Sequence, residues 1–116
     1  MQTNKQNQIV DLTFSFSLKL IKYCAVLNLE RKYQISNQLF KSGTSTGANV
    51  REAQNAESLT DFIHKIKIAA KEADETEYWL QLCKKSEGYI DPGELCSEIN
   101  SIQKILSKII STCKKK

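Results

Sequence analysis

The chain has little of what metal sites, disulfide frameworks and membrane spans are built from. Its 116 residues include one histidine, one proline, four glycines and four cysteines. The cysteines form no CxxC pair, so with a single histidine the sequence has no zinc-ligand spacing. No apolar run approaches the ~20 residues of a membrane-spanning helix, and the first residues lack the apolar segment of a signal peptide. We therefore expect a cytoplasmic protein with reduced thiols and no membrane partner.

The overall composition is that of a mildly basic globular protein. A hydrophobic content of 41% separates the chain from disordered proteins. It carries 17 Lys and Arg against 13 Asp and Glu, a net charge of +4, and three of the lysines form the terminal run 114–116. This balance is compatible with a polyanionic partner but does not require one, because a lysine run is also typical of a solvated tail.

Hydrophobic periodicity predicts four helices in a single domain that spans residues 1–116. In the last helix the apolar residues recur in alternating steps of four and three, an a/d seam. Residues 13–20 alternate polar and apolar side chains, as a strand would. No other segment offers a partner strand, so the helix is favoured. The predicted helices cover about residues 9–29, 35–54, 58–86 and 91–112, with flexible ends at 1–8 and 114–116.

The second predicted helix contains residues that weaken helices. Gly43 and Gly47 lie four residues apart, so they fall on the same side of it. A missing side chain at both positions permits close approach of another backbone. We expect the partner to be the third helix, whose centre carries Ala69 and Ala73. The alternative is a flexible glycine loop in place of this helix.

Local signals fix the ends of the last two helices. Ser58 and Asp61 have the spacing of a capping box. Gly88 is expected to end the third helix. Asp91 followed by Pro92 is typical of an N-cap with proline at the first helical position. Short links between four helices predict an all-α fold, an antiparallel up-down four-helix bundle.

The helices carry more apolar side chains than a monomeric bundle needs. Tyr78 and Trp79 lie beside the stripe of the third helix, and Phe14 and Leu18 lie off the stripe of the first. Several exposed residues of this kind would form a patch that monomers rarely show. We therefore predict self-association through these faces; the alternative is ordinary scattered surface hydrophobes.

Six short segments together resemble a known family. They are Ser42–Ser45, Gly47–Ala53, Asp61–Phe62, Lys67–Ala69, Lys71–Ala73 and Glu75–Leu80. In order and spacing they resemble the 23S rRNA intervening-sequence proteins, also labelled S23 ribosomal proteins. The sequence departs from that pattern at Thr46, where isoleucine is usual, and at residues 84–86, where apolar residues are expected. The resemblance implies a four-helix bundle assembled as a five-fold ring, often encoded inside insertions in bacterial rRNA genes.

Basic side chains are the residues that imply a partner. A ring of five copies at +4 each multiplies a modest positive face, which favours structured RNA or DNA as the partner. The alternative is a solvated charged face. The candidates are Lys19, Lys22, Arg31, Lys32, Lys41, Lys65, Lys67 and Lys71.

A second group of polar residues suggests packing rather than chemistry. Asn49, Arg51 and Glu52 lie close to the stripe of the second helix. They form either an acidic pocket or a polar network that fixes helix register or a subunit contact. Their expected partners on the third helix are Lys71, Glu72 and Glu75.

No combination of residues predicts catalysis. His64 is the single histidine, with Asp61 one turn earlier, but no nucleophile, base and orienting group converge in the sequence. The acidic run at residues 72–77 has no histidine at the spacing used by bundle metal sites. We expect no enzyme activity, no cofactor and no metal. The predicted function is an oligomeric nucleic-acid-binding module; the alternative is an assembly protein that recruits an unidentified protein without nucleic acid.

Overall fold

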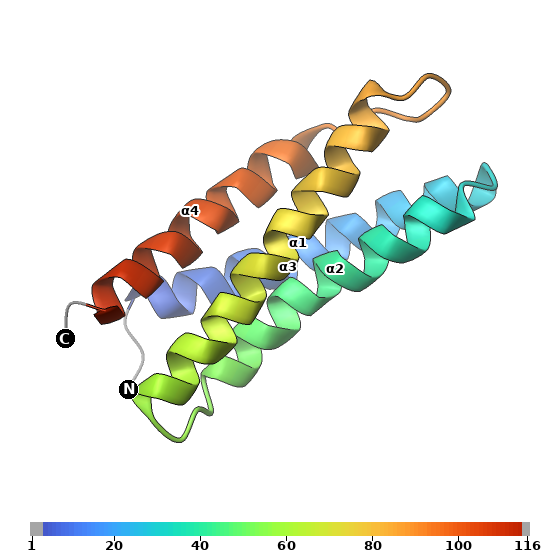
Figure 1. The fold of residues 1–116 in the computed structure, drawn as a ribbon. Coiled ribbons are helices and arrows are strands. Elements are labelled where there is room, and N and C mark those ends of the chain that lie inside the picture. Colours follow the sequence, from blue (N-terminus) through green and yellow to red (C-terminus); the bar gives the residue numbers. More distant parts are fainter. Residues whose placement is uncertain (1–3, 115–116) are drawn as a thin grey trace.

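The computed structural model describes residues 4–114, with side chains described from residue 8 onward, and contains four helices. They are α1 (Asn4–Leu29), α2 (Tyr33–Ala53), α3 (Leu59–Lys85) and α4 (Glu94–Lys114). Each helix runs antiparallel to the next in an up-down bundle (Figure 1). The α1–α2 and α3–α4 connections lie at one end, and the α2–α3 connection lies at the other. The all-α four-helix prediction is therefore confirmed.

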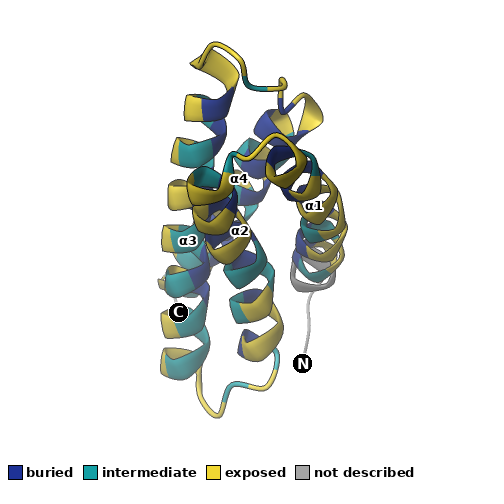
Figure 2. Cartoon of the chain, turned by 90° about the vertical axis from the view of Figure 1, so that its right-hand side faces the viewer, coloured by how far each residue is buried: buried dark blue, intermediate teal, exposed yellow. Residues whose placement is uncertain are grey.

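The four helices form a square in which only neighbours touch. Contacts join α1 to α2, α2 to α3, α3 to α4 and α4 back to α1. Buried residues face the common interior, whereas exposed residues cover the outside (Figure 2). The predicted stripes supply this core, because the period of 3.6 residues places them on one side of each helix. The fully buried large side chains include Phe16, Leu20, Leu27, Leu39, Val50, Ile66, Leu80, Ile99, Ile102 and Leu106.

The predicted ends of the helices need several corrections. The first helix begins at Asn4 rather than near Ile9, because adding residues to a formed helix is far easier than nucleating one. The second begins at Tyr33. Lys114, expected to be flexible, is the last residue of α4, and residues 1–3 and 115–116 lie outside the described part. The fourth helix begins at Glu94, because Gly93 has a left-handed φ of 59° that helical residues do not adopt.

Capping geometry explains where the helices turn. The Ser58 hydroxyl accepts a 3.0 Å hydrogen bond from the amide of Asp61, as the capping box predicts. At the end of α1 the Lys32 amide donates to the Leu27 carbonyl at 2.8 Å, and the Arg31 amide donates to Asn28 at 3.0 Å. This pair of bonds is a Schellman motif, in which the residue after the cap is left-handed. Here that residue is Arg31, with φ of 64°, rather than glycine.

The glycines of α2 pack against α1, not against the alanines of α3 as the sequence suggested. A Cβ atom on Gly43 would overlap the buried Leu20 side chain of α1. A Cβ on Gly47 would lie 3.3 Å from Cβ of Thr13, also on α1. Both glycines are inside α2, so the alternative of a flexible glycine loop is wrong. Glycine weakens α2 as a helix, but a larger residue at these two positions would crowd α1.

Candidate nucleic-acid interface

Two of the predicted phosphate-binding lysines are already paired with carboxylates. Lys19 Nζ lies 2.6 Å from Glu98 Oε2 and 3.6 Å from Glu94 Oε2, both at the start of α4. The hydrogen bond to Glu98 raises the pKa of Lys19, so the ammonium stays charged but is locally neutralised. This salt bridge ties α1 to α4 at the surface, and Lys19 contributes little free positive charge to that side.

Lys65 is neutralised in a looser way. Its Nζ lies 3.9 Å from Asp61 Oδ1 on the same helix and 4.0 Å from Glu52 Oε1 on α2. The contact to Glu52 bridges α2 and α3 near their connection. Glu52 therefore pairs with α3, as predicted, but with Lys65 instead of Lys71.

Arg31 and Lys32 lie at the end of the bundle formed by the α1–α2 turn. Lys32 Nζ sits 4.8 Å from the centre of the Tyr89 ring, a cation–π contact between this turn and the α3–α4 connection. Together with Tyr33 these residues border a shallow hollow of about 270 Å³. Lys22 and Lys41 are exposed on α1 and α2, so the structure spreads the predicted cations over several sides of the molecule.

The remaining candidates, Lys67 and Lys71, lie on α3. The neighbouring helix α4 carries two further exposed lysines, Lys104 and Lys108, that were not among the predicted candidates. The amide of Gln103 on α4 donates to Asp74 Oδ1 at 2.8 Å and to Glu77 Oε1 at 3.2 Å on α3. Because α3 and α4 are antiparallel, this contact puts Lys104 about level with the α3 carboxylates and Lys108, one turn further on, about level with Lys71. We call Lys67, Lys71, Lys104 and Lys108 the α3/α4 basic face.

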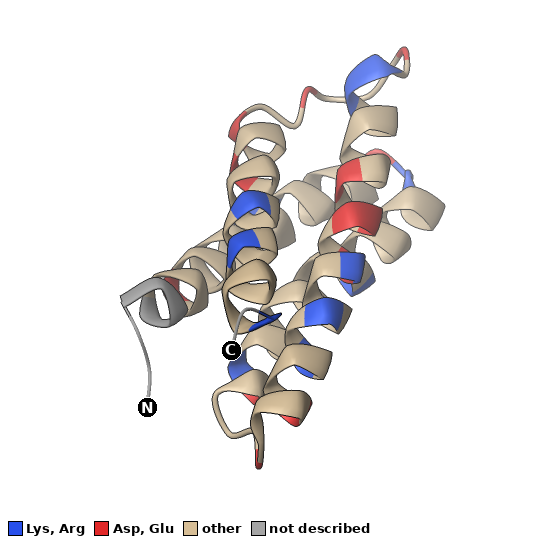
Figure 3. Cartoon of the chain, turned by 60° about the vertical axis from the view of Figure 1, so that its left-hand side comes forward, with Lys and Arg blue, Asp and Glu red and all other residues tan. Residues whose placement is uncertain are grey.

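The α3/α4 basic face adjoins the acidic stretch of α3, because Lys71 lies one turn before Asp74 and Glu75 and Lys104 follows Gln103, which contacts Asp74 and Glu77. In Figure 3, the blue stretches of α4, the helix that leads to C, lie about level with the red stretch of α3, and the blue stretches of α3 lie further from the α3–α4 connection. All four lysines are exposed, and none forms an ion pair within residues 8–114. The i, i+4 spacing of Lys104 and Lys108 was visible in the sequence. Their proximity to α3 was not, because it depends on how the two helices align.

The polar group predicted on α2 is arranged differently from the expectation. Asn49 donates 2.8 Å to the carbonyl of Ser45 on its own helix. Arg51 points away from α3 and lies over the Phe14 ring of α1, with Cζ 5.8 Å from the ring centre. The predicted pairing of these two residues across to α3 is therefore wrong. Asn49 bonds within its own helix, and Arg51 contacts a ring of α1.

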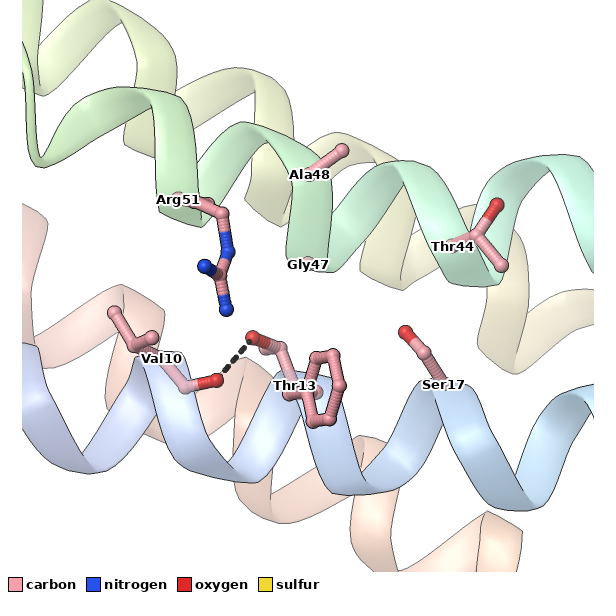
Figure 4. A pocket seen from close by; sticks show the side chains of 8 residues that line it. Val10, Thr13, Ser17, Thr44, Gly47, Ala48 and Arg51 are labelled. Atoms are coloured by element: carbon pink, nitrogen blue, oxygen red, sulfur yellow. Dashed lines mark hydrogen bonds between the residues drawn. The ribbon is translucent and has the colours of Figure 1, made fainter.

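Arg51 and Phe14 line a shallow groove between α1 and α2, with a volume of about 220 Å³. Its other lining residues are Val10, Thr13, Ser17, Thr44, Gly47 and Ala48. Figure 4 shows Arg51 reaching from α2 towards α1, with the Thr13 hydroxyl donating 3.2 Å to the Val10 carbonyl. The groove is walled mainly by apolar or small side chains, and the glycine at its floor lets the two helices approach.

Of the aromatic pair predicted at an interface, Tyr78 lies exposed on α3, whereas Trp79 is partly buried against the core. Tyr78 and Trp79 meet edge to face, with ring centres 5.1 Å apart. The Trp79 indole N–H donates 3.1 Å to Glu75 Oε2. Tyr78 remains 59% exposed, so this contact leaves most of its ring open to solvent.

Buried thiols gather at the end of the bundle opposite the α2–α3 connection. Cys24 of α1 contacts Ser36 of α2, whose hydroxyl donates a 3.2 Å hydrogen bond to the Cys24 carbonyl. Burial raises the pKa of the Cys24 thiol to about 11, and burial also raises the pKa values of Cys83 and Cys96. Tyr23 donates 2.6 Å to the Ile90 carbonyl, and burial raises its pKa as well. These are unreactive, packed groups.

The described part of the chain shows neither a cluster of metal ligands nor a membrane-spanning helix. Within residues 4–114, no three His, Cys, Asp or Glu side chains come together as ligands for a metal ion. His64 is exposed on α3. None of the four helices is long and apolar enough to cross a membrane.

Comparison with known proteins gives the family of this bundle. Residues 5–111 match the family model described as 23S rRNA-intervening sequence protein. The chain belongs to this family. Among solved structures, the intervening-sequence protein is similar to a protein of unknown function from the S23 ribosomal protein family of Bacteroides thetaiotaomicron. The two are 38% identical with a TM-score of 0.85, over 92% of this chain and 98% of the other. None of the curated proteins matches it.

Family membership confirms the resemblance, and the matched residues reach into all four helices. Neither similar description names a reaction or a ligand. For this intervening-sequence protein, function must therefore be argued from its own surfaces.

Proposed function

We propose that this intervening-sequence protein is a non-enzymatic, homo-oligomeric module that binds structured RNA or DNA through the α3/α4 basic face. The observation that carries the proposal is the presence, on two adjoining helices, of four exposed lysines that form no ion pair with any side chain the structure describes. Ammonium groups of this kind bind backbone phosphates and release the counterions condensed on them. They carry no base specificity by themselves, so the ligand is defined by shape and charge.

Oligomerisation would multiply the positive charge that this face offers to one nucleic acid. Four lysines per copy engage a polyanion weakly, but several copies in one assembly bind the same strand with a high effective concentration. A pentamer is the assembly that the family resemblance implies. Five chains of 13.2 kDa would give a particle of about 66 kDa.

A charge-matched pair of variants tests the basic face. Lys104→Gln with Lys108→Gln removes two unpaired charges, whereas Lys19→Gln with Lys65→Gln removes two charges that already face carboxylates. Both variants lower the net charge equally. We expect the first to reduce the slope of log affinity against log salt by about 2, and the second to leave it nearly unchanged.

The measurement is fluorescence anisotropy with a labelled RNA hairpin and a DNA duplex of matched length, at several salt concentrations. Light scattering on the same samples gives the particle mass. Equal losses in both variants, or no salt-sensitive binding by the wild-type protein, would contradict the proposal.

A second candidate function is an assembly protein that recruits another protein without nucleic acid. It is favoured by the exposed apolar side chains of α1, among them Phe14 and Leu18. Binding through such a surface depends little on salt, whereas phosphate binding weakens steeply with it. Salt-insensitive capture of one purified protein, without RNA binding, would select this candidate.

A further inference from the structure

We propose that a second copy of this chain docks the acidic outer ridge of its α3 onto the apolar outer face of α1 and α2, head to tail. The inference deepens the proposed function and rests on its oligomeric part, because it names the two surfaces that would meet. Both surfaces lie within the part of the chain whose side chains are described.

The first surface is a second apolar stripe on α1. Phe14, Leu18 and Ile21 follow one another in steps of four and three residues, on the side opposite the core stripe. Phe14 is 56% exposed and Leu18 is 51% exposed. A helix with two apolar stripes is typical of a helix covered on both sides. The step pattern is that of a helix–helix seam, so the complementary partner is another helix.

Residues of α2 extend this stripe across the groove. Leu20 packs on Gly43, and Cys24 contacts Ser36, so the intervening Phe40 of α2 lies beside the Ile21 turn of α1. Phe40 is 46% exposed. Phe14, Leu18, Ile21, Phe40 and Arg51 are called the α1/α2 face below.

Positive charge predominates on and beside the α1/α2 face. The Arg51 guanidinium lies over the Phe14 ring and has no carboxylate partner among residues 8–114. Lys22 follows Leu18 by one helical turn and is exposed. Asp11 lies one turn before Phe14 and is the single acidic residue of α1. An occupant of this face should therefore be an apolar helix surface with carboxylates at its edges.

The outer ridge of α3 has that chemistry. Residues 72–83 contain four carboxylates and no lysine or arginine. Their described side-chain partners are neutral amide or indole donors, and none forms an ion pair within residues 8–114. Tyr78 and Leu82, one turn apart, follow these carboxylates along α3, and both are exposed. Asp74, Glu75, Tyr78 and Leu82 are called the α3 ridge.

Two unlike surfaces on one chain permit repeated head-to-tail contact. The helices α1 and α3 do not touch, since each contacts only α2 and α4, so their outer faces point to different sides of the bundle. Each copy then offers an α3 ridge to one neighbour and an α1/α2 face to the other. Such heterologous contacts close into a ring when the rotation between copies fits, whereas an isologous contact would stop at two.

Cross-linking tests this pairing directly in the full chain. One batch carries Leu18→Cys and another Tyr78→Cys, both in a Cys113→Ser background to remove the one thiol that is not fully buried. Both new cysteines replace exposed residues, so folding should be preserved. A short bismaleimide should join chains in the mixed sample and not in either batch alone. Cross-linking of Leu18→Cys by itself would indicate an isologous contact and overturn the proposal.

Charge reversal provides an independent measurement. Arg51→Glu should raise the protein concentration needed for assembly by about 10-fold or more, because it places like charges at the contact. Adding Asp74→Lys and Glu75→Lys in the same chain should restore assembly. Lys108→Glu, on the α3/α4 basic face, is the matched control and should leave the mass unchanged while weakening RNA binding.

The outcomes separate this inference from the proposed function. An assembly that persists without the mixed cross-link and without sensitivity to Arg51→Glu would overturn the head-to-tail contact and leave nucleic-acid binding untouched. A monomer at every concentration would overturn both the contact and the oligomeric part of the proposed function. Loss of RNA binding in Lys108→Glu, with intact assembly, would separate the two surfaces experimentally.

Discussion

At the scale of single residues, the structure assigns different roles to residues that look alike in the sequence. Gly43 and Gly47 both face α1, but only Gly43 lies directly against a large buried side chain. Lys19 and Lys104 are both exposed lysines, yet one is neutralised by two carboxylates and the other is free of ion pairs within the described side chains. Local sequence does not reveal either difference, because each depends on a residue from another helix.

Substitution of the two glycines by alanine should separate their roles. In Gly43→Ala the new methyl group meets Leu20, which is fully buried, so we expect a loss of about 1–3 kcal/mol from overpacking. In Gly47→Ala the nearest side-chain atom is 3.3 Å away, and the better helix propensity of alanine, worth about 1 kcal/mol, offsets the crowding. Urea unfolding of both variants measures the difference. Equal destabilisation would mean that α1 and α2 are not in this register.

At the scale of helices, a small buried polar contact links α2 to α3. The hydroxyls of Ser42 and Thr76 lie 2.9 Å apart, and Thr76 also donates 2.7 Å to the Glu72 carbonyl. Both side chains are fully buried. Since a buried polar group is costly without a partner, the contact favours one alignment of the two helices.

A double-mutant cycle tests this contact. Thr76→Val should destabilise the protein by about 1–2 kcal/mol because it leaves the Ser42 hydroxyl with a poorer partner. Ser42→Ala with Thr76→Val should cost less than the sum of the single changes. Thr44→Val is the control, since the Thr44 hydroxyl donates to Phe40 on its own helix and should combine additively with Thr76→Val. Additivity of the Ser42 and Thr76 changes would indicate that the contact contributes nothing.

At the scale of the whole molecule, charge and apolar surface are unevenly distributed around the bundle. The α1/α2 face is apolar with cationic edges, the α3 ridge is acidic, and the α3/α4 basic face carries four lysines that form no ion pair among the described side chains. A net charge of +4 conveys none of this arrangement. The distribution is what supports separate surfaces for assembly and for nucleic acid.

Stability of the whole bundle should fall at alkaline pH. An unfolded thiol has a pKa near 9, whereas burial raises the pKa of Cys24 to about 11 and also raises those of Cys83 and Cys96. Above pH ~9 the unfolded chain therefore releases protons that the native state retains, and the free energy of unfolding falls until the native thiols ionise. Urea midpoints at pH 7.5 and 10.5 measure this. Cys24→Ala should show a smaller drop between the two pH values than wild type, and a flat wild-type profile would contradict the assignment.

The sequence by itself determined the number of helices, their core stripes and the family. Those features follow from local periodicity, from caps such as Ser58 with Asp61, and from residues along α2 and α3. Only the packed structure shows that Gly43 faces α1, that Arg51 lies over the Phe14 ring, and that Lys104 and Lys108 lie on the helix beside the one that carries Lys71. The physical reason is that a helical pattern fixes which side of a helix is buried, whereas only the packing of four helices fixes which neighbour each flank meets and at what level.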